Sequence, residues 1–251
     1  MERIKTGISG FDELVEGGLP LKFNMLITGA PGTGKTVFGI QYIYYGAKNG
    51  EPGVYVSLDS SKERIAEQAK ILGMDLEELE REKKLILLEI PTDMMLVNVF
   101  EMIDSAVKSI GAKRLVFDNL INFAINIDQF VIPLKYKVDP TTTAIDGNSD
   151  SRNKTLYRGG NTQRITYLLL NELIKSGTTN IVITASSDSG DQLTADGISE
   201  YACDGVVRLH TIEGEESFNT LNIMKMRLTN VNRGVFNFRI GQGGISMIMD
   251  E

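Results

Sequence analysis

The chain has 251 residues, of which 42% are hydrophobic and 24% charged, a composition typical of a globular protein with an ordinary core. Its single cysteine, Cys203, excludes an intramolecular disulfide, and together with a single histidine it leaves too few soft ligands for a zinc site. The formal net charge of −7 argues against a broad attraction to nucleic acid or anionic lipid.

The sequence shows no sign of a targeting or membrane-spanning segment. The first residues, Met1-Glu2-Arg3-Ile4-Lys5, lack the apolar run of a secretory signal. No stretch approaches the roughly 18 consecutive apolar residues expected of a membrane-spanning helix. We therefore expect a cytoplasmic protein that makes no membrane contact.

Short apolar runs alternate with longer amphipathic segments through most of the chain, a pattern typical of successive βα units and a mainly parallel sheet. We expect strands at residues 24–28, 54–58, 85–90, 115–117 and 180–184. We expect helices at residues 35–49, 61–72, 76–84, 96–110 and 163–176. Beyond Gly205 the pattern changes to antiparallel β-hairpins, with strands at residues 206–212, 219–226, 236–240 and 245–249. The sequence therefore predicts a single α/β domain over residues 1–251, with a twisted sheet flanked by helices and C-terminal hairpins.

One segment, residues 128–161, interrupts this alternation. It is rich in Thr, Asn, Asp and Gly and has no clear hydrophobic periodicity. A long connection of this kind inside a compact domain is usually functional or disordered. We therefore expect an irregular insertion there.

The first predicted strand runs into a glycine-rich loop that fits the pattern G-x-x-x-x-G-K-[ST]. The loop and the residue after it are Gly29, Ala30, Pro31, Gly32, Thr33, Gly34, Lys35, Thr36 and Val37. Glycines let such a backbone wrap a phosphate, and its N–H groups form an anion site at the positive end of the following helix. Lys35 would then bridge the β and γ phosphates while the Thr36 hydroxyl ligates Mg²⁺. The loop predicts a P-loop for a nucleoside triphosphate with magnesium, with ATP as the leading expectation over GTP.

A P-loop needs a second carboxylate at the tip of a neighbouring strand to hold the water shell of the metal. The apolar run Arg114-Leu115-Val116-Phe117-Asp118 provides one at its end. We therefore take Asp118 as the second magnesium-site residue.

Four stretches of this sequence resemble the KaiC-like branch of the RecA superfamily. They are residues 6–14 with residues 17–20 (TGISGFDEL and GGLP), the P-loop, residues 53–58 (GVYVSL), and Lys225-Met226-Arg227. The resemblance spans nearly the whole chain at the length of one domain. It implies a RecA-like core and ATP bound at subunit interfaces, usually in a six-membered homo-oligomeric ring.

The resemblance also assigns residues near the C-terminal end. Lys225 and Arg227 match the K-x-R pair of the family, which reaches from one subunit to the γ-phosphate bound by its neighbour. Such a cation stabilises the charge of the transition state and couples turnover to assembly. Met226, Thr229 and Val231 fall where the family lines the nucleotide pocket. The residues alone also fit an edge strand with solvated basic side chains.

The sequence departs from the family after the second predicted strand. KaiC-like proteins usually carry a pair of glutamates there, one of which activates the attacking water, whereas this chain has Asp59-Ser60. Asp59 keeps a carboxylate but is one methylene shorter, and a small misplacement of a base can lower the rate about a hundredfold. We take Asp59 as the candidate base of a slow ATPase. The alternative is an ATP sensor that binds the nucleotide without hydrolysing it.

The insertion falls where RecA-type proteins carry a loop that faces the ring channel or the filament axis. Its last part and the helix after it carry the basic and aromatic side chains Arg152, Lys154, Tyr157, Arg158 and Arg164. Such a cluster could bind single-stranded nucleic acid by phosphate contact and stacking. We favour a solvated polar loop, because four aspartates earlier in the segment nearly cancel this charge.

Three functions therefore stay open. The leading one is a homo-oligomeric, KaiC-like ATPase, hexameric by resemblance, that regulates or remodels a protein partner. The others are a recombinase-type DNA-binding ATPase and the non-hydrolysing sensor.

Overall fold

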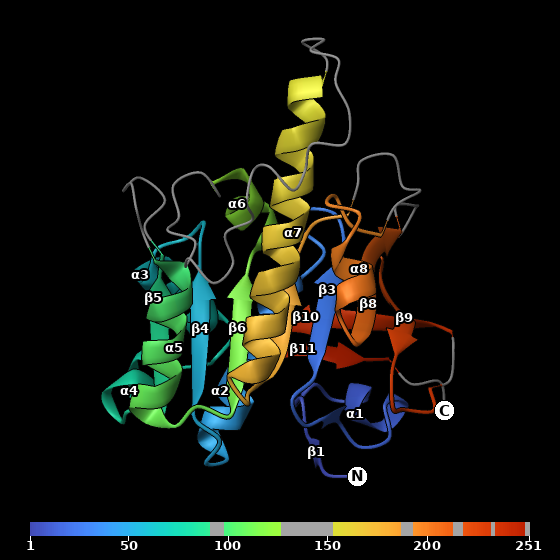
Figure 1. The fold of residues 1–251 in the computed structure, drawn as a ribbon. Helices are drawn as coiled ribbons and strands as arrows, with labels where there is room; N and C mark the ends of the chain where they lie inside the picture. Colours follow the sequence, from blue (N-terminus) through green and yellow to red (C-terminus); the bar gives the residue numbers. More distant parts are fainter. Residues whose placement is uncertain (91–97, 127–152, 187–192, 213–217, 232–233, 249–251) are drawn as a thin grey trace.

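A computed structural model of the chain describes residues 1–90, 98–126, 153–186, 193–212, 218–231 and 234–248 (Figure 1). Its main feature is a nine-stranded sheet with the order β11-β10-β9-β8-β3-β7-β6-β4-β5. The strands are β3 (Asn24–Thr28), β4 (Gly53–Ser57), β5 (Leu85–Glu89), β6 (Arg114–Asp118), β7 (Thr179–Ile183), β8 (Gly205–Ile212), β9 (Phe218–Met226), β10 (Val235–Gly241) and β11 (Gly244–Met247).

The sheet has a parallel part and an antiparallel part. Strands β5, β4, β6, β7, β3 and β8 pair in parallel, whereas β8, β9, β10 and β11 pair antiparallel. The predicted α/β fold with a mainly parallel sheet and C-terminal hairpins is therefore confirmed. Near the N-terminus, β1 (Arg3–Ile4) and β2 (Leu19–Pro20) pair as a separate two-stranded sheet. The short helix α1 (Phe11–Leu14) lies between these two strands in the sequence.

Helices cover both faces of the sheet, because alternate residues of its buried strands point to opposite sides. Tyr55 and Val116 belong to the core shared with α2 (Lys35–Lys48), α3 (Lys62–Ile71) and α4 (Leu76–Arg81). Val54 and Leu115, one residue earlier on the same strands, belong to the core under α5 (Val99–Ile110) and α7 (Asn153–Lys175). Helices α6 (Leu120–Ile125) and α8 (Ser199–Ala202) complete the second layer (Figure 1).

Side-chain caps fix where several of these helices begin. Ser61, Asp75, Asn98 and Asn119 each accept a hydrogen bond from a backbone N–H of the first turn, at α3, α4, α5 and α6. Such caps typically stabilise a helix by about 1 kcal/mol. The boundaries after β4 and β6 are therefore encoded locally, and these are the strands that carry the carboxylates of the predicted site.

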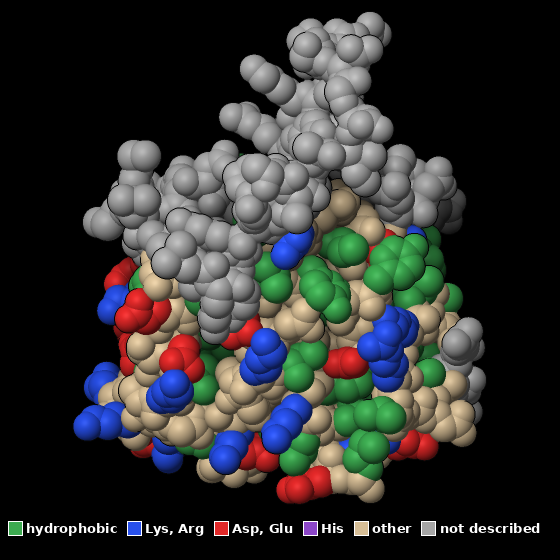
Figure 2. Space-filling model, viewed as in Figure 1, with side chains coloured by type: hydrophobic (Ala, Val, Ile, Leu, Met, Phe, Trp, Pro, Cys, Tyr) green, Lys and Arg blue, Asp and Glu red, His purple; other side chains and the backbone are tan. Residues whose placement is uncertain are grey.

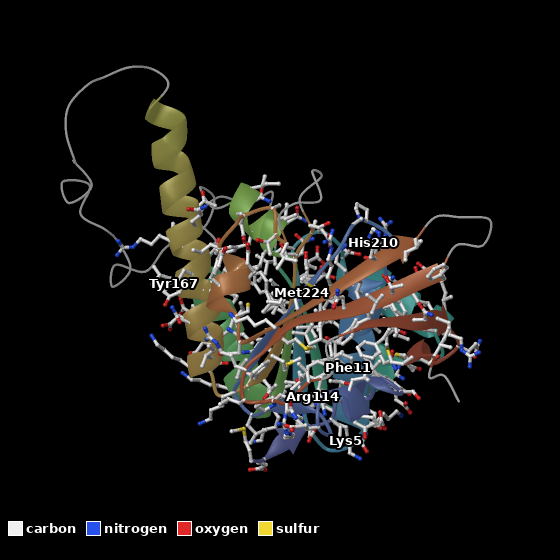
Figure 3. All side chains as sticks on the ribbon, turned by 90° about the vertical axis from the view of Figure 1, so that its right-hand side faces the viewer. Lys5, Phe11, Arg114, Tyr167, His210 and Met224 are labelled. Carbon is white, nitrogen blue, oxygen red and sulfur yellow. The ribbon has the colours of Figure 1, made fainter. Side chains whose placement is uncertain are left out.

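The structure corrects one expectation about the insertion. Helix α7 begins at Asn153 and not at residue 163, so residues 153–161 are helical, and residues 127–152 lie outside the described part. The first turns of α7 rise beyond the end of the sheet (Figures 1 and 3). The sequence of these turns, residues 153–161, carries no regularly spaced apolar residues, so hydrophobic periodicity could not reveal the helix there.

Smaller differences occur elsewhere. The helix expected at residues 76–84 ends at Arg81, and that expected at residues 96–110 is described from Val99. Elements β1, β2, α1, α6 and α8 were not anticipated, because two to six residues are too few to show a period. Within the described residues, no helix is both long enough and apolar enough to cross a bilayer.

Candidate functional site

The P-loop joins the end of β3 to the start of α2, with Gly34 in the position just before the helix. Gly34 has a φ of 94°, in the left-handed region that a residue with a Cβ adopts only with strain. It also brings no side chain to cap the helix, so the first N–H groups of α2 face the loop. The backbone therefore has the form of an anion site at the positive end of a helix.

The Lys35 side chain folds back over this loop. Its Nζ donates hydrogen bonds to the carbonyl oxygens of Gly29 and Ala30, at 2.8 and 2.7 Å. Burial lowers the pKa of Lys35, and the nearby charge of Asp118 partly opposes that shift. The ammonium group thus lies within the loop, where an anion would also be placed.

Asp118 lies beside the start of α2, as the sequence predicts. Its Oδ2 accepts a hydrogen bond from the Thr36 hydroxyl at 2.9 Å and another from the Tyr55 hydroxyl at 2.7 Å. Burial raises the pKa of Asp118, and the Asp59 charge adds to the shift, while the bonds from Tyr55 and Thr36 and the Lys35 charge oppose it. The fold therefore joins residues far apart in sequence around one buried carboxylate.

Asp59 lies next to this carboxylate at the same edge of the sheet. Ser57 pairs with Asp118 across β4 and β6, so the residues that follow each strand are neighbours. The Asn119 amide donates a hydrogen bond to Asp59 Oδ2 at 3.1 Å, and Asp59 is exposed. Ser57 holds the turn through bonds to the backbone of Ser60. Asp59 is thus an oriented, solvent-accessible carboxylate.

The hairpin of β10 and β11 reaches the P-loop from the far end of the chain. A Cβ placed on Gly34 would lie 2.7 Å from Ile240 Cδ1, so the two residues are in close contact. Gln41 of α2 holds the hairpin by accepting a bond from the Ile245 N–H at 2.7 Å. Sequence reasoning missed Ile240, because nothing in a β-hairpin pattern tells which loop it packs against.

Lys225 and Arg227 lie away from the P-loop of their own chain. Lys225 pairs with Val206 and the end of β9 lies beside the start of β8, whereas the P-loop follows Thr28, which pairs with Arg208. Lys225 Nζ donates to the backbone carbonyls of residues 200, 201 and 203 at the end of α8, at 3.0, 3.2 and 2.6 Å. Burial lowers its pKa, with a further contribution from Arg227.

The other residues of this stretch differ in exposure. The Arg227 guanidinium is more than half exposed and forms a 3.3 Å ion pair with Asp204. The Met226 side chain is buried in the core. The Thr229 hydroxyl accepts a bond from Arg3 at 3.0 Å, and Val231 packs against the core. Arg227 is therefore the basic side chain of the K-x-R pair that extends into solvent.

Sequence reasoning did not single out Tyr55, Asn119 or Arg3. The sequence could have pointed to Asn119, because it directly follows the candidate carboxylate Asp118. It could also have pointed to Tyr55, because Tyr55 shares its strand face with Ser57. No sequence pattern pointed to Arg3. Its guanidinium joins the N-terminal segment to the turn after β9 by donating to the carbonyls of Gly18 and Leu228, both at 3.0 Å.

The donor atoms around Asp118 suit a magnesium ion. Mg²⁺ prefers oxygen ligands and usually retains several waters beside one or two protein groups and the phosphates of a nucleotide. Thr36 and Asp118 supply a hydroxyl and a carboxylate oxygen within hydrogen-bond distance of each other. Among the described residues no three His, Cys, Asp or Glu side chains gather into a metal site, so these two would hold the ion together with a nucleotide.

Comparisons with known proteins agree with these features. A profile of the family described as "ATPase: KaiC" matches residues 4–132 and 137–251. The circadian clock oscillator protein KaiC of Prochlorococcus marinus subsp. pastoris is 30% identical over 256 residues, which cover 98% of this chain and 45% of that protein. A protein of Aeropyrum pernix named UPF0273 protein is 30% identical over 258 residues, which cover 100% of this chain and 95% of that protein.

A solved structure is similar over its full length. The crystal structure of a KaiC-like protein from Pyrococcus horikoshii matches with a TM-score of 0.78 and 31% identity, covering 99% of each chain. This chain spans about half the length of the clock proteins it matches, and nearly all of these two archaeal relatives.

Proposed function

This chain belongs to the KaiC ATPase family, and we propose that it binds ATP with magnesium at residues 29–37 and hydrolyses it slowly within a homo-oligomeric ring. The observation that carries the proposal is the Thr36–Asp118 hydrogen bond beside Lys35 at the start of α2. It joins a P-loop to a carboxylate from a neighbouring strand, which is the arrangement by which P-loop proteins bind Mg²⁺ and the phosphates of a nucleotide.

Each residue of the site would have a defined task. Lys35 and the N–H groups of α2 would bind and orient the triphosphate. Magnesium, when bound between Thr36 and Asp118, would neutralise phosphate charge. Asp59 would accept a proton from the attacking water, whose oxygen bonds to the γ-phosphorus as the bond to ADP breaks, giving ADP and phosphate. Asp59 is one methylene shorter than the glutamate usual in the family, so its imperfect reach to the water fits slow turnover.

We propose further that Arg227 acts on the nucleotide of a neighbouring subunit. It lies away from the P-loop of its own chain, and its guanidinium is exposed. Leu228, directly after it, and Met224, three residues before it, are exposed hydrophobic residues, as are Tyr201 on α8 and Tyr167 on α7. Hydrophobic side chains are exposed on the α7 and α8 side of the molecule (Figure 2). Exposed apolar residues next to an arginine are typical of a protein interface.

The first experiment is steady-state ATP turnover with Mg²⁺, comparing the natural chain with Lys35→Ala, with GTP as a second substrate. We expect slow turnover by the natural chain, and a loss of turnover and nucleotide binding in the variant. Turnover that survives in Lys35→Ala would contradict the assignment of the P-loop.

The same measurement distinguishes the slow ATPase from the second candidate function, a non-hydrolysing ATP sensor. The observation that favours it is the exposed position of the shortened carboxylate, Asp59. Tight ATP binding without turnover would support the sensor. Under either function, we propose that the nucleotide state of the ring regulates or remodels a protein partner. Nucleic-acid binding by α7 stays a less favoured proposal: it requires binding that weakens steeply with salt and depends on Arg158 and Arg164.

A further inference from the structure

Tyr55 is buried in the middle of β4, and its hydroxyl is directed at the predicted magnesium site. The residue is 1% exposed, and its hydroxyl donates to Asp118 Oδ2 at 2.7 Å. The Thr36 hydroxyl donates to the same oxygen. Two donors from different elements thus act on one carboxylate oxygen, while Oδ1 is the oxygen that neither of them uses.

The register of the sheet explains why this tyrosine reaches the carboxylate. Tyr55 pairs with Val116, two residues before Asp118 on β6. Paired residues and residues two apart share a face of the sheet, so Tyr55, Val116 and Asp118 all point toward α2. A side chain of β4 opposite Val116 must reach diagonally across to β6, two residues further along that strand, to meet Asp118. A tyrosine is long enough for this step and ends in a donor, whereas phenylalanine is shorter by the hydroxyl.

The packing of α2 fixes the direction of the ring. A Cβ placed on Gly39 would lie 2.9 Å from Val116 Cγ1 and 3.5 Å from Tyr55 Cε2. The absence of a side chain at Gly39 therefore lets α2 lie close to the sheet over these two residues. A ring enclosed in this way has little freedom, so its hydroxyl is held in place before any ligand binds.

The Tyr55 hydroxyl acts as the donor in this contact. A carboxylate oxygen accepts hydrogen bonds, so the Tyr55 hydroxyl directs its proton to Asp118 Oδ2 across the 2.7 Å contact. A hydrogen bond to a charged acceptor is stronger than a neutral one.

We propose that Tyr55 is a positioning residue for magnesium: by holding Asp118 Oδ2, its hydroxyl orients the carboxylate toward the water shell of the ion. This inference rests on the proposed function of the site. It concerns the metal and not the nucleotide, because Tyr55 contacts Asp118, whereas the phosphate-binding groups belong to residues 29–37. Tyr55 therefore sets how tightly the nucleotide site takes up Mg²⁺.

The test compares Tyr55→Phe with Tyr42→Phe. Tyr42 is also fully buried, and its hydroxyl donates to the Thr179 carbonyl at 2.9 Å at the start of β7, the opposite end of the sheet. Both variants delete one bonded hydroxyl from the core. For each protein, the affinity for a fluorescent ATP analogue is measured by equilibrium titration in EDTA and then over a series of Mg²⁺ concentrations.

We expect Tyr55→Phe to keep the affinity in EDTA within about twofold and to need about five- to tenfold more Mg²⁺ for half of the metal-dependent gain, as fits the loss of a bond to a charged group. Tyr42→Phe should need the same Mg²⁺ as the natural chain. An unchanged Mg²⁺ requirement in Tyr55→Phe would overturn the inference. So would an equal change in Tyr42→Phe, or a loss of binding in EDTA by Tyr55→Phe, since either would indicate a general effect of core packing. Failure of the natural chain to bind the analogue at all would instead contradict the proposed function.

Discussion

At the scale of single residues, the site depends on polar side chains that directly follow buried strands. Asp118 ends β6, Asn119 follows it, and Asp59 lies two residues beyond the end of β4. Their closeness follows from the pairing of Ser57 with Asp118. Asn119 has two roles, because its carbonyl oxygen caps α6 while its amide donates to Asp59. The same residue thus fixes the start of a helix and the orientation of the candidate base.

The first prediction concerns Asp59. We expect Asp59→Asn to lower kcat about a hundredfold, because the side chain keeps its shape but can no longer accept a proton from water. ATP affinity should change little, since Asp59 does not belong to the P-loop. Steady-state turnover and equilibrium binding measure the two effects separately.

Ser60→Ala is the matched control, since the bonds at that turn use the Ser60 backbone. Its turnover should equal that of the natural chain. Equal turnover in Asp59→Asn and the natural chain would exclude Asp59 as the base.

At the scale of elements, a bulge in β9 decides what the K-x-R pair can do. The register between β8 and β9 shifts at Val206 and Val207, so Ile223 and Met226 face the same core while Lys225 points to the other side. A bulge adds one residue to a strand and reverses the faces of those that follow. Lys225 thereby reaches the last carbonyls of α8, where a cation is favourable.

The second prediction separates the two basic residues. We expect Lys225→Met to lower the free energy of unfolding by about 1–3 kcal/mol, because three carbonyls at the end of α8, two of them in partly buried bonds, lose their donor. Arg227→Ala should leave stability almost unchanged, since its ion pair is exposed, and should lower turnover on the order of a thousandfold if it acts on a neighbouring nucleotide.

Urea denaturation and steady-state turnover of both variants test this division. The interpretation would be wrong if Lys225→Met were as stable as the natural chain. It would also be wrong if Arg227→Ala kept full turnover.

At the scale of the whole molecule, the two sides of the proposed subunit contact lie at different ends of the sheet. The P-loop is at the carboxyl end of β3, near the end at which Figure 3 shows His210. Arg227 follows the end of β9, which lies beside the start of β8, and Figure 3 shows Arg114, the first residue of β6, at that opposite end. One chain therefore presents its phosphate site and its exposed arginine in different places, which fits a head-to-tail ring.

The third prediction follows from the apolar residues beside Arg227. We expect Leu228→Asp to weaken assembly with Mg²⁺ and ATP and to lower turnover at least about tenfold, because it places a charge within an apolar interface. Leu228 is 67% exposed within one chain, so folding should not suffer. Size-exclusion chromatography with light scattering gives the oligomeric state.

Ile71→Asp provides the comparison, since Ile71 is 73% exposed on α3, across the sheet. It should assemble as the natural chain does. Normal assembly of Leu228→Asp would place the interface elsewhere.

The sequence by itself determined the features that contiguous residues encode. The P-loop, the position of Asp118 at a strand end, the parallel strands and the C-terminal hairpins each depend on a local pattern of glycines or of alternating apolar residues. The family resemblance pointed to Lys225 and Arg227 but gave them one shared role. The early start of α7 was missed because its first turns lack an apolar stripe.

Only the tertiary structure decided which distant residues meet. The bond from Tyr55 to Asp118 requires the register of β4 on β6 and the close approach of α2 at Gly39. The bonds of Lys225 to α8 require a bulge, and the contact of Ile240 with Gly34 requires the last hairpin to fold back over the P-loop. Register and packing join residues far apart in the chain, and no local pattern specifies those pairings.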